Sequence, residues 1–269
     1  MCPLDSHFLK RSSRGRLNPD GKNLAFFSEY AGGVEMLALT LAHKRQRTTW
    51  FGELALRPRQ PVSLPAGDVV PAFLNAATPS LARAEADALP PGAIYHSYDR
   101  LRVMQFQAGV QRDWPVAGGV ALSAVAEVVG KHVAHLPDPA RRRYGRAEVF
   151  GNGPVYGVCT VTSPDAARQC SFDGYTSRIA AAYRVRLDAR KTLPDRALLL
   201  HGWALLTHDV KGWSHDGFIN EGRRVLNLGV RVEYRQRYSA EAVYAPIWGG
   251  AYNAQADRDQ LLLAVGMRF

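Results

Sequence analysis

Apolar and polar residues alternate one by one in ten stretches of this chain of 269 residues. From Leu226 to Tyr234, leucine, valine and tyrosine take every second position, and mostly polar residues such as Arg231 and Glu233 take the positions between. Successive side chains of a β-strand point to opposite faces of a sheet, so a period of two predicts strands. We expect ten strands, at 22–30, 34–43, 49–57, 101–111, 120–130, 175–188, 196–207, 224–236, 238–245 and 261–269.

The links between the predicted strands alternate in length. After a short first link, the long links are 58–98, 131–174, HDVKGWSHDGFINEG and APIWGGAYNAQADRD, and KRQR, DWPVAG, ARKTLP and RQRY are the short ones. Outer-membrane barrels join their strands in this way, with short periplasmic turns and long outer loops. The sequence therefore predicts an all-β fold: an antiparallel up-and-down transmembrane barrel of about ten strands, with short periplasmic turns and long extracellular loops.

A soluble antiparallel sandwich or barrel would show the same alternation, and this alternative stays open. Two features favour the membrane barrel. Single strands carry charges of both signs on their polar face, which a watery lumen tolerates, and aromatic residues near the strand ends are typical of an interfacial girdle. These aromatic residues are Trp50, Tyr175, Tyr234, Tyr244 and Phe269.

The net charge of +10 suits nucleic acid, anionic lipid or an anionic ligand equally well. Lysine and arginine are spread along the whole chain, which weighs against nucleic acid as a partner. No run of about 18 apolar residues predicts a spanning helix. Residues 1–22 are basic but contain no apolar core, so they do not form a secretory signal peptide.

Three short motifs precede the last predicted strand: a His-Asp-Val-x-Gly turn, a Glu-Gly-Arg strand start, and a Tyr-Asn pair followed by Asp-Arg-Asp. Their residues are His208, Asp209, Val210, Gly212, Glu221, Gly222, Arg223, Tyr252, Asn253, Asp257, Arg258 and Asp259. Earlier, a Gly-Glu strand at Gly52 leads into Arg-Pro-x-x-Pro-Val. Together these motifs resemble DUF1302, a family of proteobacterial outer-membrane barrels of unknown function, over roughly Lys22 to Phe269.

Members of that family are longer and begin with a signal peptide. The resemblance thus implies that 22–269 is the C-terminal part of a larger barrel, from a truncated or mis-started gene, and that 1–21 is a leader outside the fold. It leaves open whether this chain closes a barrel alone. It also implies a hydrophobic or amphiphilic cargo, and as partners an inner-membrane exporter of the resistance-nodulation type and a periplasmic lipid-binding protein.

Charged residues on the polar face of the strands are candidates for the barrel lumen. They are Glu53, Glu127, Arg178, Arg184, Arg186, Arg231, Glu233 and Arg235. Two interpretations stay open: an ion-paired ladder that stiffens the wall, or a cationic track for anionic or amphiphilic solutes. The opposite face should meet lipid, with Ile179, Tyr183, Val185, Leu226, Leu228, Val230, Val232, Leu263 and Val265 pointing outward.

Cys159 and Cys170 lie in the longest predicted outer loop. An oxidising cell surface permits a disulfide there, which would stabilise the protein by roughly 3 kcal/mol by closing a short loop. We expect their Cα atoms to lie about 4.4–6.8 Å apart. Two unpaired thiols are the alternative.

Other motifs give weaker indications. His201, His208 and His215 recur every seven residues, which suits no single ligand set for a metal, and we expect no metal or cofactor. The basic segment ARRRYGR at Ala140 is interpreted as a solvated outer loop that contacts anionic lipopolysaccharide, or that only aids solubility. Ser123 and Ser177 sit in no recognisable nucleophile turn, so we expect no enzyme and no catalytic residue.

The chain ends on an apolar strand and a terminal aromatic residue, Phe269. Outer-membrane barrels share such an ending, which their assembly machinery reads, so Phe269 is a candidate assembly signal. The leading functional hypothesis is a passive conduit, or part of an export channel, in the bacterial outer membrane, in contact with lipid and lipopolysaccharide. The alternatives are a structural or surface-interaction barrel that acts through its outer loops, and a soluble basic β-domain that binds nucleic acid.

Overall fold

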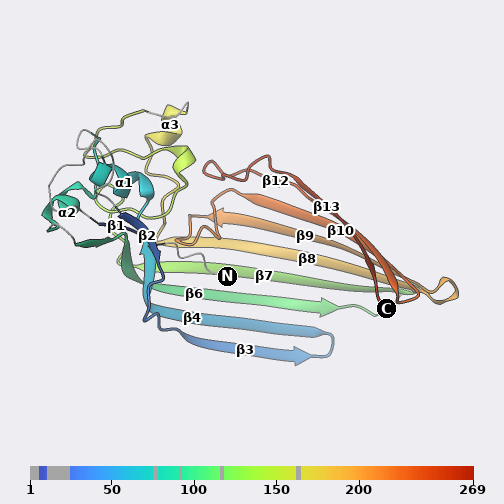
Figure 1. The fold of residues 1–269 in the computed structure, drawn as a ribbon. Coiled ribbons are helices and arrows are strands. Elements are labelled where there is room, and N and C mark those ends of the chain that lie inside the picture. The colour runs from blue at the N-terminus through green and yellow to red at the C-terminus, as the bar shows by residue number, and fades with distance from the viewer. Residues whose placement is uncertain (1–5, 11–24, 75–77, 91–92, 116–117, 162–164) are drawn as a thin grey trace.

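The computed structural model describes residues 6–10, 25–74, 78–90, 93–115, 118–161 and 165–269. They form an all-β, antiparallel protein built on one large sheet, ordered β13-β11-β10-β9-β8-β7-β6-β4-β3, with short β12 beside β10 (Figure 1). The strands are β3 (Leu37–Arg45), β4 (Thr48–Ser63), β6 (Tyr98–Asp113), β7 (Val120–Ala134), β8 (Ile179–Leu193), β9 (Leu198–Lys211), β10 (Arg224–Tyr234), β11 (Tyr238–Ala245), β12 (Ile247–Trp248) and β13 (Gln260–Met267).

The first predicted strand, 22–30, does not join this sheet. Its described part is β2 (Ala25–Glu29), which pairs with β1 (Ser6–Lys10), and β1 pairs with β5 (Ile94–His96) in a separate three-stranded sheet. The prediction that 22–30 lies beside 34–43 is therefore wrong. Of the predicted leader, Ser6–Lys10 is a strand of this small sheet, and the other residues of 1–21 lie outside the described residues.

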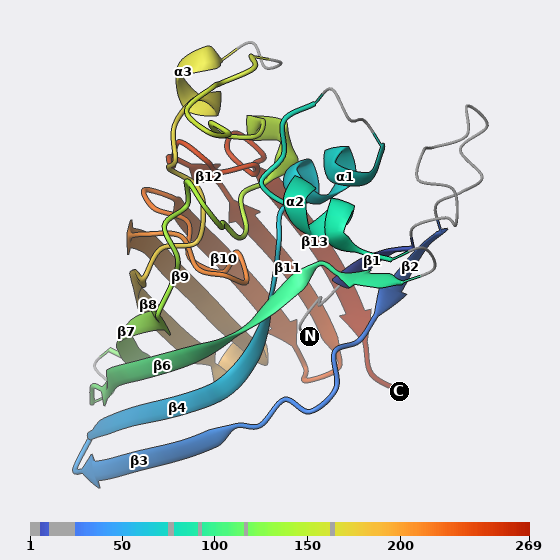
Figure 2. The same ribbon diagram turned by 90° about the vertical axis from the view of Figure 1, so that its left-hand side faces the viewer.

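The large sheet is curved but not closed, and β3 and β13 are its two free edges (Figure 2). Short turns at 46–47, 114–119, 194–197 and 235–237 lie at one end, which we call the turn end. The segments 64–97, 135–178, 212–223 and 246–259 lie at the other, the loop end. The predicted alternation of short and long links is thus confirmed, because every strand crosses the sheet once before the chain turns back.

The loop end carries the helices α1 (Ala66–Leu74), α2 (Arg83–Ala88) and α3 (Ala166–Gln169), and the 3-10 turn η1 (Glu148–Phe150). A second 3-10 turn, η2 (Pro194–Arg196), lies at the turn end. The described parts of two loop segments, 64–97 and 135–178, pack together over the end of the sheet into what we call the cap. Its hydrophobic core is Val62, Leu64, Val69, Ala72, Ala82, Ala86, Tyr95 and Tyr144.

Aromatic rings cover glycines of neighbouring strands at three places in the sheet. Phe51 lies over Gly109, Phe106 over Gly130, and Trp203 over Gly229; a Cβ atom on Gly229 would stand 2.0 Å from the Trp203 ring. Such pairs fill the space left by a missing side chain and fix the register of neighbouring strands. None of the helices in the described residues is long and apolar enough to cross a membrane.

Candidate functional site

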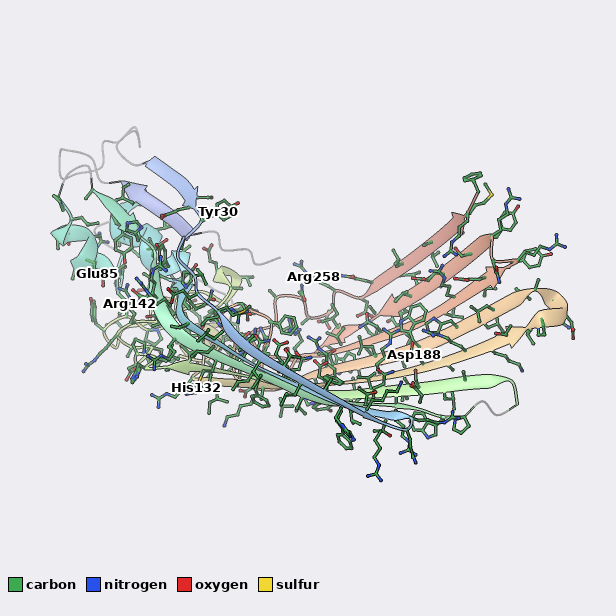
Figure 3. The ribbon with its side chains drawn as sticks, turned by 90° about the horizontal axis from the view of Figure 1, so that it is seen from below. Tyr30, Glu85, His132, Arg142, Asp188 and Arg258 are labelled. Atoms are coloured by element: carbon green, nitrogen blue, oxygen red, sulfur yellow. A yellow bond between two sulfur atoms is a disulfide. The ribbon has the colours of Figure 1, made fainter. Side chains whose placement is uncertain are left out.

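The two faces of the large sheet differ in chemistry. Residues predicted to point outward share one face, the outer face, because the register aligns Val185 with Leu206 and Leu226, and Val230 with Ala242 and Leu263. Many of its side chains are exposed, with Leu263 at 70% and Val265 at 90%. Figure 3 shows His132 of this face on the convex side of the sheet, and Asp188 of the opposite, inner face on the concave side.

Ion pairs lie on the inner face, between side chains of β8, β9 and β10. Arg186 donates from Nε to Asp188 Oδ2 at 2.7 Å, and His201 Nε2 lies 2.8 Å from Asp188 Oδ1. On β10, Arg231 donates from Nε to Glu233 Oε1 at 2.9 Å. These contacts support the ion-paired ladder for Arg186 and Arg231.

Arg184 differs from the other two arginines. Glu127 lies directly opposite it on β7, yet among the described residues Arg184 forms no ion pair. Its guanidinium carbon instead stands 4.8 Å from the centre of the Phe218 ring, which comes from the link between β9 and β10. On the same face, towards the β3 edge, Glu53 accepts a long hydrogen bond, 3.5 Å, from the Thr40 hydroxyl.

Two predicted lumen residues do not lie on the inner face as expected. Arg235 has a left-handed backbone (φ 51°) in the turn 235–237 after β10, and its guanidinium lies over the Tyr234 ring. Arg178 precedes β8 at the loop end and is exposed. The predicted strand 175–188 began four residues before β8, and the predicted strand 224–236 ended two residues after β10, because the alternation continues into the adjoining loop or turn.

Residues 212–223, which we call the inner loop, fold back onto the inner face. Ile219 is only 1% exposed and packs with Val129, Ala180 and Ala182 of the sheet. Asp216 forms an ion pair with Lys131 of β7, whose side chain is 7% exposed. The Phe218 ring centre lies 5.0 Å from Lys131 Nζ. This loop therefore occupies part of the concave side near the loop end.

The family-motif residues hold the two ends of the inner loop together. Buried Asp209 accepts from Arg223 Nε at 2.7 Å and from the Asn220 backbone N–H at 2.9 Å. Glu221 accepts from the Gly212 N–H at 2.6 Å, and Gly222 donates its N–H to the Asp209 carbonyl. A left-handed backbone at Gly212 and Gly222 suits glycine at both positions. The motif is thus a scaffold for the inner loop.

The third motif, the Tyr-Asn pair with Asp-Arg-Asp, fixes the link 246–259. The Tyr252 carbonyl accepts from Asn220 Nδ2 at 2.7 Å, and the Tyr252 hydroxyl donates to the Arg168 carbonyl at 2.8 Å. Asp259 accepts from the Tyr244 hydroxyl at 2.5 Å and from the Ile247 N–H. The remaining residues of the three motifs lie in separate places. His208 lies near Tyr183 on the outer face, and Asn253 donates to the Gly249 carbonyl. Asp257 has a left-handed backbone, and Val210 and Arg258 are exposed.

The arginine-rich segment at Ala140 is not a solvated loop, which corrects the interpretation from sequence. Arg143 is fully buried (0% exposed) and donates from Nε and Nη2 to both oxygens of Asp68, at 2.6 and 2.5 Å. Arg142 bonds both oxygens of Asp99 and pairs with Glu85. Arg141 is the exposed member. The segment thus joins the two halves of the cap.

Arg146 lies between two aromatic rings inside the cap. Its guanidinium carbon stands 4.9 Å from the centre of the Tyr175 ring and 4.8 Å from that of Tyr252, and its nitrogens donate to carbonyls, among them those of Phe150 and Ser171. Burial lowers the pKa of this group. Tyr175 is buried here, so the prediction that it belongs to an aromatic girdle is wrong.

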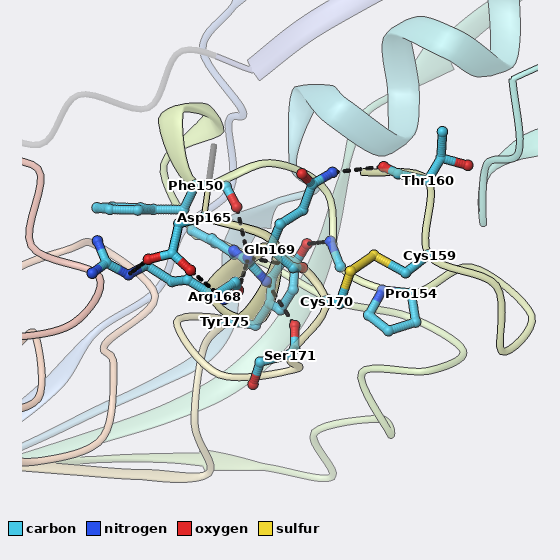
Figure 4. The surroundings of a disulfide bond; sticks show 12 residues. Phe150, Pro154, Cys159, Thr160, Asp165, Arg168, Gln169, Cys170, Ser171 and Tyr175 are labelled. Carbon is cyan, nitrogen blue, oxygen red and sulfur yellow. Dashed lines mark hydrogen bonds and ion pairs between the residues drawn. A yellow bond between two sulfur atoms is a disulfide. The ribbon is translucent and has the colours of Figure 1, made fainter. Parts of the chain in front are cut away.

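Cys159 and Cys170 form a disulfide in the cap, with Cα atoms 5.6 Å apart (Figure 4). The bond closes a loop whose second half is α3. Asp165 caps that helix by accepting from the Arg168 N–H at 2.9 Å, and Gln169 donates across the loop to the Thr160 carbonyl at 2.8 Å. The disulfide therefore holds in place the segment whose Arg168 carbonyl accepts hydrogen bonds from Tyr252 and Arg146.

The three regularly spaced histidines do not meet. His201 bonds Asp188 on the inner face, His208 contacts Tyr183 on the outer face, and His215 is within the inner loop. Across the described residues, no group of three or more histidine, cysteine or acidic side chains could hold a metal ion.

The inner loop should loosen as the pH falls below about 6.5. Burial, together with the charges of Lys131 and Arg57, lowers the pKa of His215 from 6.5, although Asp216 opposes this. The unfolded loop then binds more protons than the folded one, so its stability is complete above pH 6.5 and declines below it. Burial raises the pKa of Asp216, but hydrogen bonds from Lys131 and Ser214 lower it to about 2, so Asp216 does not titrate in this range.

Hydrogen exchange of the amides of 212–223, corrected for intrinsic rates, should therefore show less protection at pH 5 than at pH 7.5. The His215→Gln variant should show the same protection at both. An equal loss of protection in that variant would contradict the assignment to His215.

Fold and site together define a class: an antiparallel β protein whose large curved sheet has an exposed apolar face, a face with ion pairs and a folded cap at one end. The chain matches the model of the family described as Protein of unknown function (DUF1302) over residues 12–269, and it belongs to this family. A search of curated proteins found no match.

Proposed function

We propose that this sheet is part of the wall of an outer-membrane β-barrel, whose non-enzymatic role is that of a passive conduit for hydrophobic, amphiphilic or anionic solutes. One observation carries the proposal: the outer face is apolar and exposed across the sheet, from Leu37 and Leu39 on β3 to Leu263 and Val265 on β13. Soluble monomers rarely expose apolar patches larger than a few hundred square ångströms. Lipid would cover this face at little cost in free energy.

The inner face supports the same proposal. Several of its charges form ion pairs beside what would be a water-filled space, as Arg186 with Asp188 and Arg231 with Glu233 do. The inner loop narrows that space near the loop end. The free edges at β3 and β13 would have to be paired in a bilayer, because each unsatisfied backbone group there costs several kcal/mol.

A second function, surface interaction through the cap, is favoured by exposed apolar side chains on the segment that precedes the disulfide. Tyr156 and Val158 project from a tight turn just before Cys159. Nucleic-acid binding has less support, since Arg142, Arg143 and Arg146 are committed to contacts inside the cap. The exporter, the periplasmic lipid-binding protein and lipopolysaccharide remain proposed partners, on analogy with the family alone.

Reconstitution tests the proposal. The purified chain should need detergent to stay in solution, and it should raise the conductance of planar bilayers when added from detergent. A chain that stays monodisperse without detergent would favour a soluble β-domain. Insertion without conductance would favour the structural or surface-interaction barrel.

Deleting Phe269 should lower assembly into the outer-membrane fraction more than substituting Arg268 does. Phe269 is fully exposed just beyond β13, where no contact with the described residues explains an aromatic residue. The expected measurement is the amount of chain in outer-membrane fractions for the parent, the Phe269 deletion and Arg268→Gln. Equal amounts for the deletion and the parent would contradict the role of Phe269 as an assembly signal.

A further inference from the structure

We infer that Arg184 and Phe218 together form a selectivity site for organic anions that carry an apolar body, an inference that rests on the proposed conduit. The two residues come from different elements, β8 and the inner loop, and meet on the concave side where that loop narrows the space. The guanidinium carbon of Arg184 lies 4.8 Å from the Phe218 ring centre, and Phe218 is 47% exposed.

Arg184 forms no ion pair with the described residues, unlike three other basic residues of the inner face. Lys131 is neutralised by Asp216, Arg186 by Asp188, and Arg231 by Glu233 and Glu241. Among the described residues Arg184 has no such partner, although Glu127 lies opposite in the register. A passing anion would therefore meet this guanidinium without having to displace a carboxylate.

Phe218 adds an apolar surface at the same place. The backbone around it is fixed, because its N–H donates to Asp216 and its carbonyl accepts from Arg223. Ile219 next to it is anchored in the wall. A ring held beside a free guanidinium suits a solute with a negative group attached to an apolar or aromatic body, since one part pairs with the charge and the other packs on the ring.

Reversal potentials in planar bilayers test the two residues separately. In a potassium chloride gradient, Arg184→Gln should lower the chloride-to-potassium permeability ratio roughly fivefold, the effect of one unit charge at about 4 Å in water. Arg231→Gln is the matched control, because it removes the same charge from a paired position and should change the ratio less. Under bi-ionic conditions, Phe218→Ala should lower the permeability of benzenesulfonate relative to methanesulfonate.

Equal effects of Arg184→Gln and Arg231→Gln would overturn the inference, as would an unchanged benzenesulfonate preference in Phe218→Ala. Hydrogen exchange of 212–223 in each variant shows whether the inner loop is still folded. A variant whose inner loop is folded but whose selectivity equals that of the parent counts against the site. A parent that conducts no ions after insertion would overturn the conduit itself, which distinguishes that failure from a failure of this site alone.

Discussion

Replacing Arg143 with methionine should destabilise the protein by about 3–5 kcal/mol, because it leaves the Asp68 carboxylate buried without a partner. Both residues are almost completely buried, and the pair joins helix α1 to the segment that follows β7. Urea titration of the detergent-solubilised chain, followed by far-ultraviolet circular dichroism, measures the change in the free energy of unfolding.

Two further variants make this test specific. Arg141→Met removes the same charge from an exposed position of the same segment and should change stability by no more than about 0.5 kcal/mol. The double variant Asp68→Leu and Arg143→Met should recover much of the loss, since an apolar pair replaces the ion pair. A single Arg143→Met variant as stable as Arg141→Met would show that the pair does not hold the cap.

Placing an arginine on the outer face should reduce folding into lipid by about 2–4 kcal/mol at mid-membrane depth. Val230 is the best position, since it lies in the middle of β10 and is half-exposed on that face. The free energy of folding of Val230→Arg into phospholipid vesicles, measured by urea titration, should fall by this amount relative to the parent.

Asn227→Arg is the control for that experiment, because Asn227 lies on the inner face of the same strand. An arginine there stays in the aqueous space and should cost little. Equal losses for the two variants would mean that the outer face does not meet lipid, and the proposed membrane wall would lose its main support.

The alternation of residues was sufficient to predict nine of the strands and the faces of their side chains, because a period of two is a local property of each strand. The place of 22–30 could not be predicted in this way. Its neighbours are decided by long-range pairing with β1 and β5, and a short strand carries little pattern of its own. The left-handed turn at Arg235 lacked the usual asparagine or glycine signal.

The site was only partly predictable. The positions of the charges followed from the alternation. The contact between Lys131 and Asp216 did not, because these residues are 85 positions apart in sequence and belong to no common motif. An apolar pair, Phe218 and Ile219, in an otherwise polar loop was the available indication that this loop turns inward. The burial of Arg143 had no such indication, since an arginine run predicts solvation until its partner at Asp68 is known.

The direction of the two free edges limits how the sheet can be completed. Both β3 and β13 run from the loop end to the turn end, because the direction alternates from strand to strand and seven strands lie between them. Joining β3 to β13 directly would make a parallel pair in an otherwise antiparallel ring, and so would joining β3 to β13 of a second copy with the same orientation in the membrane. A ring in which every neighbour is antiparallel has an even number of strands, so completing this sheet in that way takes an odd number of additional strands.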